Sequence, residues 1–585
     1  MILNFIFLLK LLFLFNLFRL WDIGVNFKMI DTKITINSLA EAISGKIVGS
    51  DDFRSPNGFT GIFNILKDSN EGDIVIRHWI DEKGIKIASS KNVACIITED
   101  PRGNSVDIAT DLKIPIIIVQ KIEEANAIAL NWSIKKFAPN SKRVIISGTN
   151  GKSTTAHMIY HILKSTGANA LTNTDSKSEY NTLIDPMVPK IISEYSLSNE
   201  KSLEYLVIEA SEVQGWLGKL MHHHALLMTK AVDPDVGVVT NVAIDHIGLV
   251  NSIEEVFEET SGIARGMKKG SLILNFDDKN VFRMANFAKK NIEPFYFSMN
   301  SNIGGYKNTN IDNIKSNSVD IDFHIKMDKI LIYDTEIESI VFKSEPILSI
   351  DELPFNSNHF IQNTLAAISA CLSLGIEIKD IINGIKSYKS LKRRFRKINH
   401  NPTIIDDFAH NPEGIKATVN AVSNLPHENL KILCAIRGSR GKEINEINAY
   451  ALAEVINSIN KKRFNKISIS NSTDNSNSNS NSNSNSNSNS NSNNELTNNC
   501  SDIEIILSSS LDVVDEANFV EEFEENIFFD VLKNEGIDFI HYKELKKAID
   551  YVYNSSKVDD IILLIGAQGM DPVEGLLNDI INEDN

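Results

Sequence analysis

Beyond residue 34, short apolar segments alternate with longer segments whose apolar residues recur at helical spacing. Three short, largely apolar segments predict the first strands: 74–76, 94–98 and 114–119. Two segments with helical spacing accompany them: 81–90 and 123–134. Because continuous apolar runs of this length are typical of buried parallel strands, we predict a first α/β unit that ends near Pro139.

The same alternation continues into a second unit, with predicted strands at 143–147, 205–208 and 236–240. The spacing of strands and helices there predicts a doubly wound α/β sheet. Residues 301–349 differ, because they are rich in Asn and Asp and alternate polar with apolar positions over short runs such as 320–325. This change of pattern predicts an antiparallel extension of the sheet.

A third unit begins near Lys389 and has predicted strands at 403–405, 431–436 and 561–565. An Asn/Ser tract, residues 470–499, interrupts this unit with an alternating repeat. Such a tract buries too little apolar surface to offset its chain entropy. We therefore predict a disordered surface insertion without a function of its own.

The N-terminal segment 1–28 has a different character. Residues 2–21 form a nearly continuous run of Leu, Phe and Ile that contains two charges, Lys10 and Arg19. About 20 apolar residues can span a bilayer, so a membrane anchor is one interpretation. A secretory signal is another, although no small-residue cleavage site follows. We favour a start at Met29, where the globular pattern begins, and rank the anchor second because of the two charges.

Composition and charge narrow the class of protein. The 585 residues suffice for about three or four domains, and 42% hydrophobic with 23% charged residues indicates a globular protein. The net charge of −17 argues against a broad nucleic-acid-binding face, and we expect no nucleic-acid partner. Four cysteines without metal-ligand spacing indicate reduced thiols in a cytoplasmic protein: Cys95, Cys371, Cys434 and Cys500.

The most specific motif follows the predicted strand 143–147 and precedes a helix predicted to start near Thr155. It reads Gly148, Thr149, Asn150, Gly151, Lys152, Ser153 and Thr154. Backbone amides between two glycines at a helix N-terminus bind anions, and Lys152 adds a charge for the β- and γ-phosphates. A hydroxyl at Ser153 or Thr154 is a suitable Mg²⁺ ligand. The alternative is a glycine turn that only caps a helix, and the preceding strand and the GKST string argue against it. The motif is shorter than the general P-loop pattern, because residue 146 is Ile and not Gly.

This motif resembles the ATP loop of the Mur ligase family, which includes folylpolyglutamate synthase and the C-terminal half of cyanophycin synthetase. Further segments resemble the family's motifs in the same order: 207–211, 240–246, 358–367, 393–395, 406–412 and 438–442. Residues 34–135 resemble the N-terminal domain of the later Mur enzymes, so the resemblance covers the chain from Met29 onward.

The resemblance implies an α/β fold with three domains: a substrate-binding domain (29–140), a central P-loop domain with a doubly wound sheet (141–388) and a Rossmann-like ligase domain (389–585). It also implies a reaction in which ATP activates a carboxylate as an acyl phosphate, which then couples to a nucleophile. A carboxylate that approaches the γ-phosphate meets strong charge repulsion, so the site needs cations. The implied cofactors are ATP and Mg²⁺.

Site residues are carried over position by position. The implied Mg²⁺ ligands are Ser153, Glu209 and His246, and the implied nucleotide contacts outside the loop are Asn241, Arg394 and Arg440. The implied catalytic residues are Lys152, His246, Asp406, His410 and Asn411. On chemistry alone His246 could equally be structural, and the resemblance favours a functional role. Asp406 could position the nucleophile or support Lys442.

Three departures from the family pattern stand out. The window 254–261 has no lysine where many Mur-type enzymes carry a carbamylated one, so Glu258 or Glu259 could hold the second metal, or the site could lack that modification. Phe360 replaces the first Asn of an HNxxN pattern, and Gly566 to Asp571 replaces a GKGHE-like turn. The run Met221 to His224 resembles a metal tract, but consecutive positions do not share a helix face, so we favour a polar surface or a substrate-pocket wall.

The substrate pair is not fixed by these motifs. We expect a small-molecule or nucleotide-linked carboxylate and an amine, as in wall precursors that include the pseudomurein type, and a cytoplasmic monomer. Candidate substrate contacts in the first domain are Arg77, His78, Trp79, Lys83 and Lys86. One alternative is the Mur-like synthetase that closes the carbocycle of the methanogen nickel-tetrapyrrole coenzyme. Another is a non-catalytic ATP-binding regulator, supported only by the missing lysine.

Overall fold

The computed structural model describes residues 35–49, 59–174, 187–199, 201–212, 214–216, 219–243, 252–300, 314–315, 324–325, 327–355, 357–398, 401–474 and 502–583. The chain divides into two compact units. The first consists of Met1–Ser141, Tyr180–Glu204 and Leu226–Asp233, and the second of Lys142–Glu179, Tyr205–Ala225 and Pro234–Asn585. The N-terminal segment 1–28, for which a membrane anchor is one interpretation, lies outside the described residues.

The first unit contains a five-stranded sheet in the order β1-β5-β4-β3-β2. Its strands are β1 (Lys46–Gly49), β2 (Phe63–Asn64), β3 (Ile74–Ile80), β4 (Cys95–Pro101) and β5 (Pro115–Ile118). The three predicted strands are thus confirmed as β3, β4 and β5, which run parallel. The sequence did not reveal β1, a strand that pairs antiparallel with β5 at the edge.

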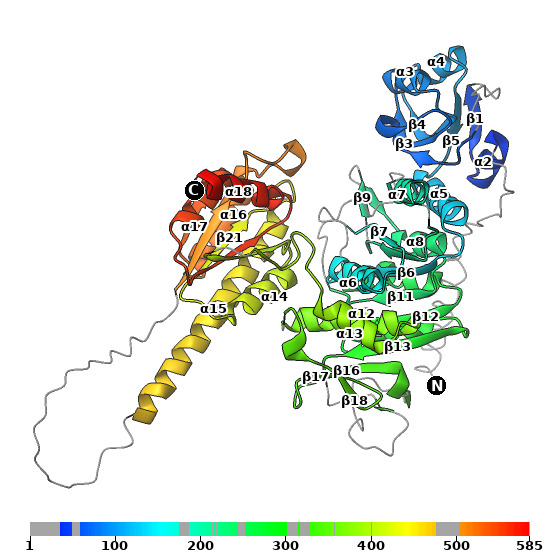
Figure 1. The fold of residues 1–585 in the computed structure, drawn as a ribbon. Coiled ribbons are helices and arrows are strands. Elements are labelled where there is room, and N and C mark those ends of the chain that lie inside the picture. Colours follow the sequence, from blue (N-terminus) through cyan, green and yellow to red (C-terminus); the bar gives the residue numbers. More distant parts are fainter. Residues whose placement is uncertain are drawn as a thin grey trace, which may run out of the picture. The chain divides into compact units, whose positions relative to one another are not determined.

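Helices cover both faces of this sheet. They are α2 (Ile36–Ala42), α3 (Glu82–Ser90), α4 (Ser105–Asp111) and α5 (Ile122–Phe137). Apolar side chains of α2 and α5 form one buried cluster with the sheet, and those of α3 and α4 form another. The two predicted helices are confirmed as α3 and α5, and Asp81 caps α3 by accepting the Gly84 amide at 2.7 Å. A further helix, α7 (Met187–Ser198), lies beside α5 in the same unit (Figure 1).

The second unit contains a nine-stranded sheet in the order β18-β17-β16-β13-β12-β11-β6-β8-β7. Its strands are β6 (Lys142–Ser147), β7 (Ala170–Thr172), β8 (Tyr205–Glu209), β11 (Val236–Val239), β12 (Gly270–Asn275), β13 (Ile292–Ser298), β16 (Ile330–Asp334), β17 (Ser339–Phe342) and β18 (Glu345–Ser349). The strands from β7 to β16 are parallel, whereas β17 and β18 are antiparallel. Both the doubly wound sheet and its antiparallel extension are therefore confirmed. Of the run 320–325, only β15 (His324–Ile325) is described, paired antiparallel with β14 (Ile314–Lys315).

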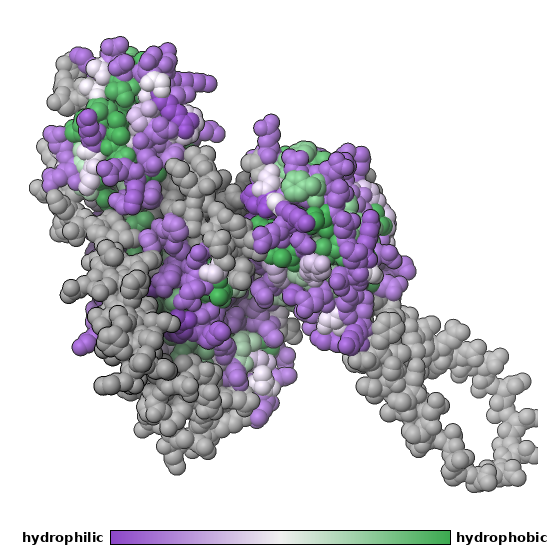
Figure 2. All heavy atoms as spheres, turned by 180° about the vertical axis from the view of Figure 1, so that it is seen from behind, coloured by the Kyte–Doolittle hydropathy of each residue, from purple (hydrophilic) through white to green (hydrophobic). Residues whose placement is uncertain are grey.

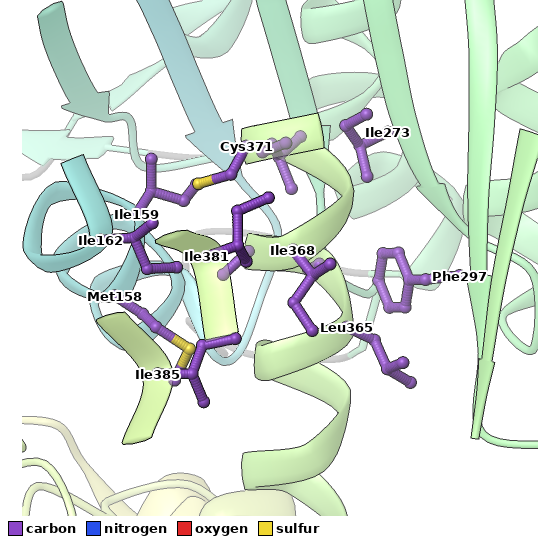
Figure 3. Close-up of a cluster of buried hydrophobic side chains, with 14 of the residues drawn as sticks. Met158, Ile159, Ile162, Ile273, Phe297, Leu365, Ile368, Cys371, Ile381 and Ile385 are labelled. Carbon is purple, nitrogen blue, oxygen red and sulfur yellow. The ribbon is translucent and has the colours of Figure 1, made fainter. Parts of the chain in front are cut away.

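One face of the nine-stranded sheet is covered by α6 (Lys152–Ser165), α12 (Asn358–Ser373) and α13 (Ile378–Lys386). Their apolar side chains point toward one another, as Met158, Ile385 and Ile368 show in Figure 3. On the opposite face, Gly237 of β11 lies against Ile263 of α10 (Gly262–Gly266), since a Cβ at Gly237 would lie 3.0 Å from that side chain. This core holds α6, the helix that follows the glycine motif, on the sheet.

The start of α6 differs from the prediction. The helix begins at Lys152 and not near Thr155, because Gly151 takes a left-handed conformation (φ +82°) and turns the chain directly into the first helical turn. Lys152, Ser153 and Thr154 are therefore helical residues. Their amides point out of the helix N-terminus, where an anion is stabilised.

The C-terminal part of the second unit has a six-stranded sheet in the order β19-β20-β24-β21-β22-β23. Its strands are β19 (Arg396–Ile398), β20 (Thr403–Asp407), β21 (Leu430–Ala435), β22 (Ile503–Ser508), β23 (Phe539–Tyr542) and β24 (Ile561–Ile565), all parallel except β19. Helices α14 (Pro412–Ser423), α15 (Lys442–Asp474) and α16 (Glu522–Asn534) cover one face, and α17 (Leu545–Asn554) and α18 (Val573–Glu583) the other. This is the predicted Rossmann-like arrangement.

The Asn/Ser tract begins inside a helix. Because α15 continues to Asp474, the first five residues of the tract that we predicted to be disordered, 470–474, are helical, and 475–499 lie outside the described residues. On the face shown in Figure 2, the described surface is mainly hydrophilic, with smaller apolar areas between. Within the described part of the chain, no helix combines the length and apolar character needed to cross a membrane.

Candidate functional site

The loop between β6 and α6 requires both of its glycines. Gly148 has φ +127°, and a Cβ there would lie 2.2 Å from Thr240 Oγ1. Gly151 has φ +82°, and a Cβ there would lie 2.2 Å from Asn363 Oδ1. The loop is therefore confined between the end of β11 and α12. At both glycines it has a backbone conformation that residues other than glycine rarely adopt.

Asn241 braces the loop from the end of β11. Its Oδ1 accepts the Asn150 amide at 2.8 Å, and its Nδ2 donates to the Asn150 carbonyl at 2.9 Å. The Asn241 carbonyl also accepts the Thr149 amide at 3.0 Å, and Thr149 Oγ1 exchanges hydrogen bonds with the backbone of Ala243. Asn241 thus shapes the loop, whereas its predicted direct contact with a nucleotide stays a prediction.

Lys152 is held by a carboxylate that the sequence analysis did not select. Its Nζ donates to the Thr149 carbonyl and to Glu212 Oε2, both at 2.9 Å. The Lys152 side chain is 14% exposed and that of Glu212 is 1% exposed, so the pair is largely desolvated. In the sequence, Glu212 stands out only because it lies three residues after Glu209.

Ser153 and Glu209 form an oxygen pair beside this lysine. Ser153 Oγ donates to Glu209 Oε1 at 2.9 Å, and both residues are buried. Asn173 fixes the backbone of Glu209 from both sides, since its Oδ1 accepts the Glu209 amide at 2.8 Å and its Nδ2 donates to the Glu209 carbonyl at 3.0 Å. A hydroxyl and a carboxylate are hard oxygen donors, so this pair fits Mg²⁺. Thr154 lies half-buried in the same helical turn.

Arg394 connects the start of α6 with the C-terminal sheet, and its neighbour Arg393 is buried within that sheet. Arg394 Nη2 lies 3.3 Å from Ser153 Oγ, and its guanidinium lies over the Phe408 ring, 4.6 Å from the ring centre. Arg393 is 4% exposed and donates to Asp406 and to the carbonyls of Gly566 and Ala567. The turn at 566–571 therefore receives the Arg393 side chain through its backbone.

Asp406 has a different partner from those predicted. The structure pairs it with Arg393, in a site where both side chains are 4% exposed, rather than with Lys442. Burial raises the pKa of Asp406, and the charge of Arg393 acts in the opposite direction. This buried pair joins the segment before β19 to the carboxyl-terminal part of β20, and a contact of Asp406 with a nucleophile stays a prediction.

Asn411 and His410 follow β20. Asn411 Nδ2 donates to Asn150 Oδ1 at 3.1 Å, and its own Oδ1 accepts the Gly414 amide as the N-cap of α14. His410 Nδ1 lies 2.7 Å from the Phe408 carbonyl, and its ring packs edge-on against the Phe408 ring. These contacts place Asn411 against the glycine loop. They place His410 against the Phe408 ring, over which the Arg394 guanidinium lies.

Arg440 contacts its own sheet. Its Nη2 lies 3.4 Å from Asn518 Oδ1, and its Nη1 lies 3.3 Å from the Ser439 carbonyl. Both partners belong to loops of the C-terminal sheet. The structure therefore does not show Arg440 at the glycine loop, and its predicted nucleotide contact is untested.

The predicted second-metal ligands are engaged elsewhere or lie outside the described residues. His246 lies in the segment 244–251, which is not described. Glu258 pairs with Arg265 at 2.7 Å. Glu259 accepts from His222 Nδ1 at 3.0 Å and from the His223 amide, and burial raises its pKa. Within the described ranges no three His, Cys, Asp or Glu side chains gather as a metal site.

The histidine tract does not act as a unit. Whereas His222 contacts Glu259, His224 is fully buried and its Nδ1 lies 2.8 Å from the Ser211 carbonyl. Phe360, the departure from the HNxxN pattern, is 3% exposed and packs against Phe355 and Tyr388. Its position belongs to the hydrophobic core rather than to the site.

Comparison with known proteins agrees with this arrangement. The model for the Mur ligase middle domain matches residues 146–371, and the model for the Mur ligase, glutamate ligase domain matches residues 393–471. Among curated relatives, the UDP-N-acetylmuramate–L-alanine ligase of Clostridium acetobutylicum is 31% identical over 303 residues, covering 50% of this chain and 54% of the relative. The corresponding enzyme of Prochlorococcus marinus is 29% identical over 297 residues, covering 50% of each chain. The chain thus spans about half the length of the curated relatives that it matches.

Solved structures share the fold over most of the chain. MurF from Acinetobacter baumannii superposes with a TM-score of 0.58 at 16% identity, covering 94% of this chain and 98% of that one. MurF from Thermotoga maritima, in complex with ADP, superposes with a TM-score of 0.55 at 16% identity, covering 90% and 98%. On the two matching domain models and this shared architecture, the chain belongs to the Mur ligase family.

Proposed function

We propose that this protein is an ATP-dependent ligase that activates a carboxylate as an acyl phosphate and joins it to an amine. The observation that carries the proposal is the convergence of Lys152, Ser153 and Arg394 at one helix N-terminus, with Glu209 beside Ser153. Three sources of positive charge, two side chains and the helix dipole, meet a carboxylate and a hydroxyl suited to a metal.

The residues have separable tasks in this proposal. The amides of the glycine loop and Lys152 hold the phosphate chain, and Mg²⁺, held by Ser153 and Glu209, supplies charge neutralisation when bound. Arg394 adds a cation from the C-terminal sheet, and its contact with Phe408 orients the guanidinium. Asn411 ties the same sheet to the loop through Asn150, so both parts of the unit supply groups to one reacting centre.

The proposed substrates are a nucleotide-linked or comparable carboxylate and an amine. Relatives named UDP-N-acetylmuramate–L-alanine ligase support this class, because their names describe a nucleotide-linked carboxylate and an amino acid. A wall precursor fits the class, and one of the pseudomurein type is included in it. We further propose that the protein acts as a cytoplasmic monomer, with domain boundaries near residues 140 and 388.

The test is release of ADP and phosphate by the full chain with ATP, Mg²⁺ and a panel of substrates. The panel contains UDP-N-acetylmuramate and its peptide derivatives with single amino acids, free amino acids alone, and the seco-tetrapyrrole acid. Lys152→Ala serves as the blank, and Glu209→Ala is expected to weaken the Mg²⁺ dependence. Turnover that needs both a carboxylate and an amine, with a product that contains the new amide, supports the proposal.

Other outcomes separate the alternatives. Turnover with the tetrapyrrole alone would indicate the cyclising synthetase. Nucleotide binding without turnover across the whole panel would indicate a regulator. Near-normal turnover by Lys152→Ala would remove the glycine loop from the reaction.

A further inference from the structure

The loop that precedes α15 has the backbone form of an anion-binding nest. Ser439 and Gly441 have φ values of +55° and +84°, which turn successive amides toward one side of the chain. The loop also lies at the N-terminus of a long helix, where the dipole favours a negative charge. By backbone geometry alone, residues 439–441 would be expected to hold an anionic ligand.

An internal carboxylate occupies this nest. Glu524 Oε1 accepts the amides of Arg440 and Gly441 at 2.9 and 2.7 Å, and Oε2 accepts the Ser439 amide at 3.1 Å. The Glu521 amide donates to Oε2 as well, at 3.0 Å. Glu524 is 0% exposed. Hydrogen bonds to an ionised acceptor are stronger than neutral ones, so the three from residues 439–441 hold the loop firmly, and the fourth ties the same carboxylate to the start of α16.

The position of the loop connects it with the proposed site. It follows β21, and the Phe408 to Asn411 segment follows β20, two strands away in the same parallel sheet. Carboxyl ends of parallel strands lie at one edge, where α/β sheets bind ligands. Asn411 contacts the glycine loop, and Asn448 of α15 donates to the His410 carbonyl at 2.9 Å. The loop at 438–441 therefore lies on the edge that serves the proposed site.

We propose that Glu524 is a positioning residue for the ligase reaction: it replaces an external anion in the nest and fixes the loop so that the side chains of Arg440 and Lys442 meet the ligand. Because the backbone amides are already used, ligand contact in this loop passes from the main chain to these two cations. The expected effect of Glu524 on turnover rests on the proposed function. The expected effect of Glu524 on the loop at 439–441 does not depend on that function.

Glu524 has a second role that the experiment must separate. It is also the N3 residue of a capping box at the start of α16, in which the Glu521 side chain accepts the Glu524 amide. Glu521→Ala removes that half of the capping box but leaves the Glu524 carboxylate in the nest. It is therefore the matched control for a loss of the helix cap alone.

The experiment compares Glu524→Ala with Glu521→Ala by amide hydrogen exchange at residues 439–441 and by kcat and KM. In Glu524→Ala we expect faster exchange at these amides and a fall in kcat of about tenfold or more, because a poorly fixed loop misplaces its cations. Acetate matches the atoms removed, so it should restore slow exchange and part of kcat. Chloride at equal ionic strength should not, and propionate, which is longer, should restore less.

Glu521→Ala should keep slow exchange in the loop and a kcat within about twofold of the wild type, with no response to acetate. Unchanged exchange in Glu524→Ala, or exchange that acetate does not slow, would overturn the nest. Exchange that responds while kcat stays at the wild-type value would overturn the positioning role. Absence of turnover in the wild type itself would reject the proposed function, while the exchange results would still decide whether Glu524 fixes the loop.

Discussion

Lys152 Nζ lies 2.9 Å from Glu212 Oε2, and the Glu212 side chain is 1% exposed. The lysine that we assign to the phosphate chain therefore already has an anionic partner. Removing either member of such a pair leaves a buried charge without compensation, which is costly. The pair also means that phosphate groups approach a lysine whose charge is partly neutralised.

Replacing Glu212 by Gln should strengthen nucleotide binding. The change removes a negative charge close to the incoming phosphates and leaves the side-chain volume almost unchanged, so we expect the Kd for Mg-ATP to fall by about three- to tenfold. Isothermal titration calorimetry checks this, with Lys152→Ala as the variant that lacks the cation. A weaker affinity in Glu212→Gln would show instead that the carboxylate orients Lys152 for the nucleotide.

The same substitution should lower the stability of the nucleotide-free protein. A buried ammonium that loses its counter-ion is expected to cost about 1–3 kcal/mol in the free energy of unfolding. Chemical unfolding without and with Mg-ATP measures the effect. We expect the nucleotide to recover more stability in Glu212→Gln than in the wild type. An equal recovery in both proteins would contradict the view that Glu212 neutralises Lys152 until the phosphates bind.

Arg394→Lys should reduce turnover more than nucleotide binding. Lysine keeps the charge, but it lacks the planar group that lies over Phe408 and reaches Ser153 Oγ at 3.3 Å. We expect kcat to fall by about tenfold or more with a smaller change in the KM for ATP. The control is Arg396→Lys, which alters an arginine two residues away that pairs with Glu574. Equal losses in the two variants would indicate a general effect on this segment.

Local pattern predicted the strands but not the contacts between them. Apolar runs identified β3, β6 and β24 because buried parallel strands are continuous in hydrophobicity. The edge strand β1, with its exposed and half-buried residues, has no such run. The start of α6 was misplaced because the left-handed Gly151 shortens the loop, and a sequence pattern does not show which glycine takes that conformation.

The site shows the same division. Lys152 and Ser153 lie in a motif whose chemistry is local, so their role could be proposed from the sequence. Glu212 and Asn363 act on that motif from positions 60 and more than 200 residues away, and Glu524 reaches Gly441 across 83 residues. Such partners are defined by tertiary packing alone. A single carboxylate or amide carries no periodic signal that would select it beforehand.

Acid should destabilise the protein through His157. Burial lowers the pKa of His157 from 6.5 to about 4, while its Nδ1 lies 3.2 Å from the Tyr388 hydroxyl. Between pH 6.5 and 4 the unfolded chain binds a proton that the folded protein does not, so stability is present above this window and is lost as the pH falls through it. In His157→Gln, the loss of unfolding free energy between pH 7 and 5 should be smaller by about 2 kcal/mol.

Urea unfolding at the two pH values measures this difference. His359→Gln provides a second test, because burial lowers the pKa of His359 to about 4 as well. If the pH dependence of the wild type and of both variants ran parallel, these histidines would not be buried in the neutral form.

Gly151→Ala should disable the glycine loop through two separable effects. A Cβ would lie 2.2 Å from Asn363 Oδ1, and alanine is strained at φ +82° by about 1 kcal/mol. The matched control is Gly167→Ala, where φ is +84° and nothing lies within 4 Å of the added Cβ. Gly167→Ala therefore carries the strain without the collision, and we expect it to lower stability slightly while nucleotide binding stays close to the wild type.

Gly151→Ala should weaken nucleotide binding by about tenfold or more, because the loop must move away from α12. The double variant Gly151→Ala/Asn363→Ala removes the colliding amide and should recover part of that affinity, which titration with Mg-ATP would measure. If the double variant bound nucleotide no better than Gly151→Ala, backbone conformation rather than the contact with Asn363 would account for the glycine at this position.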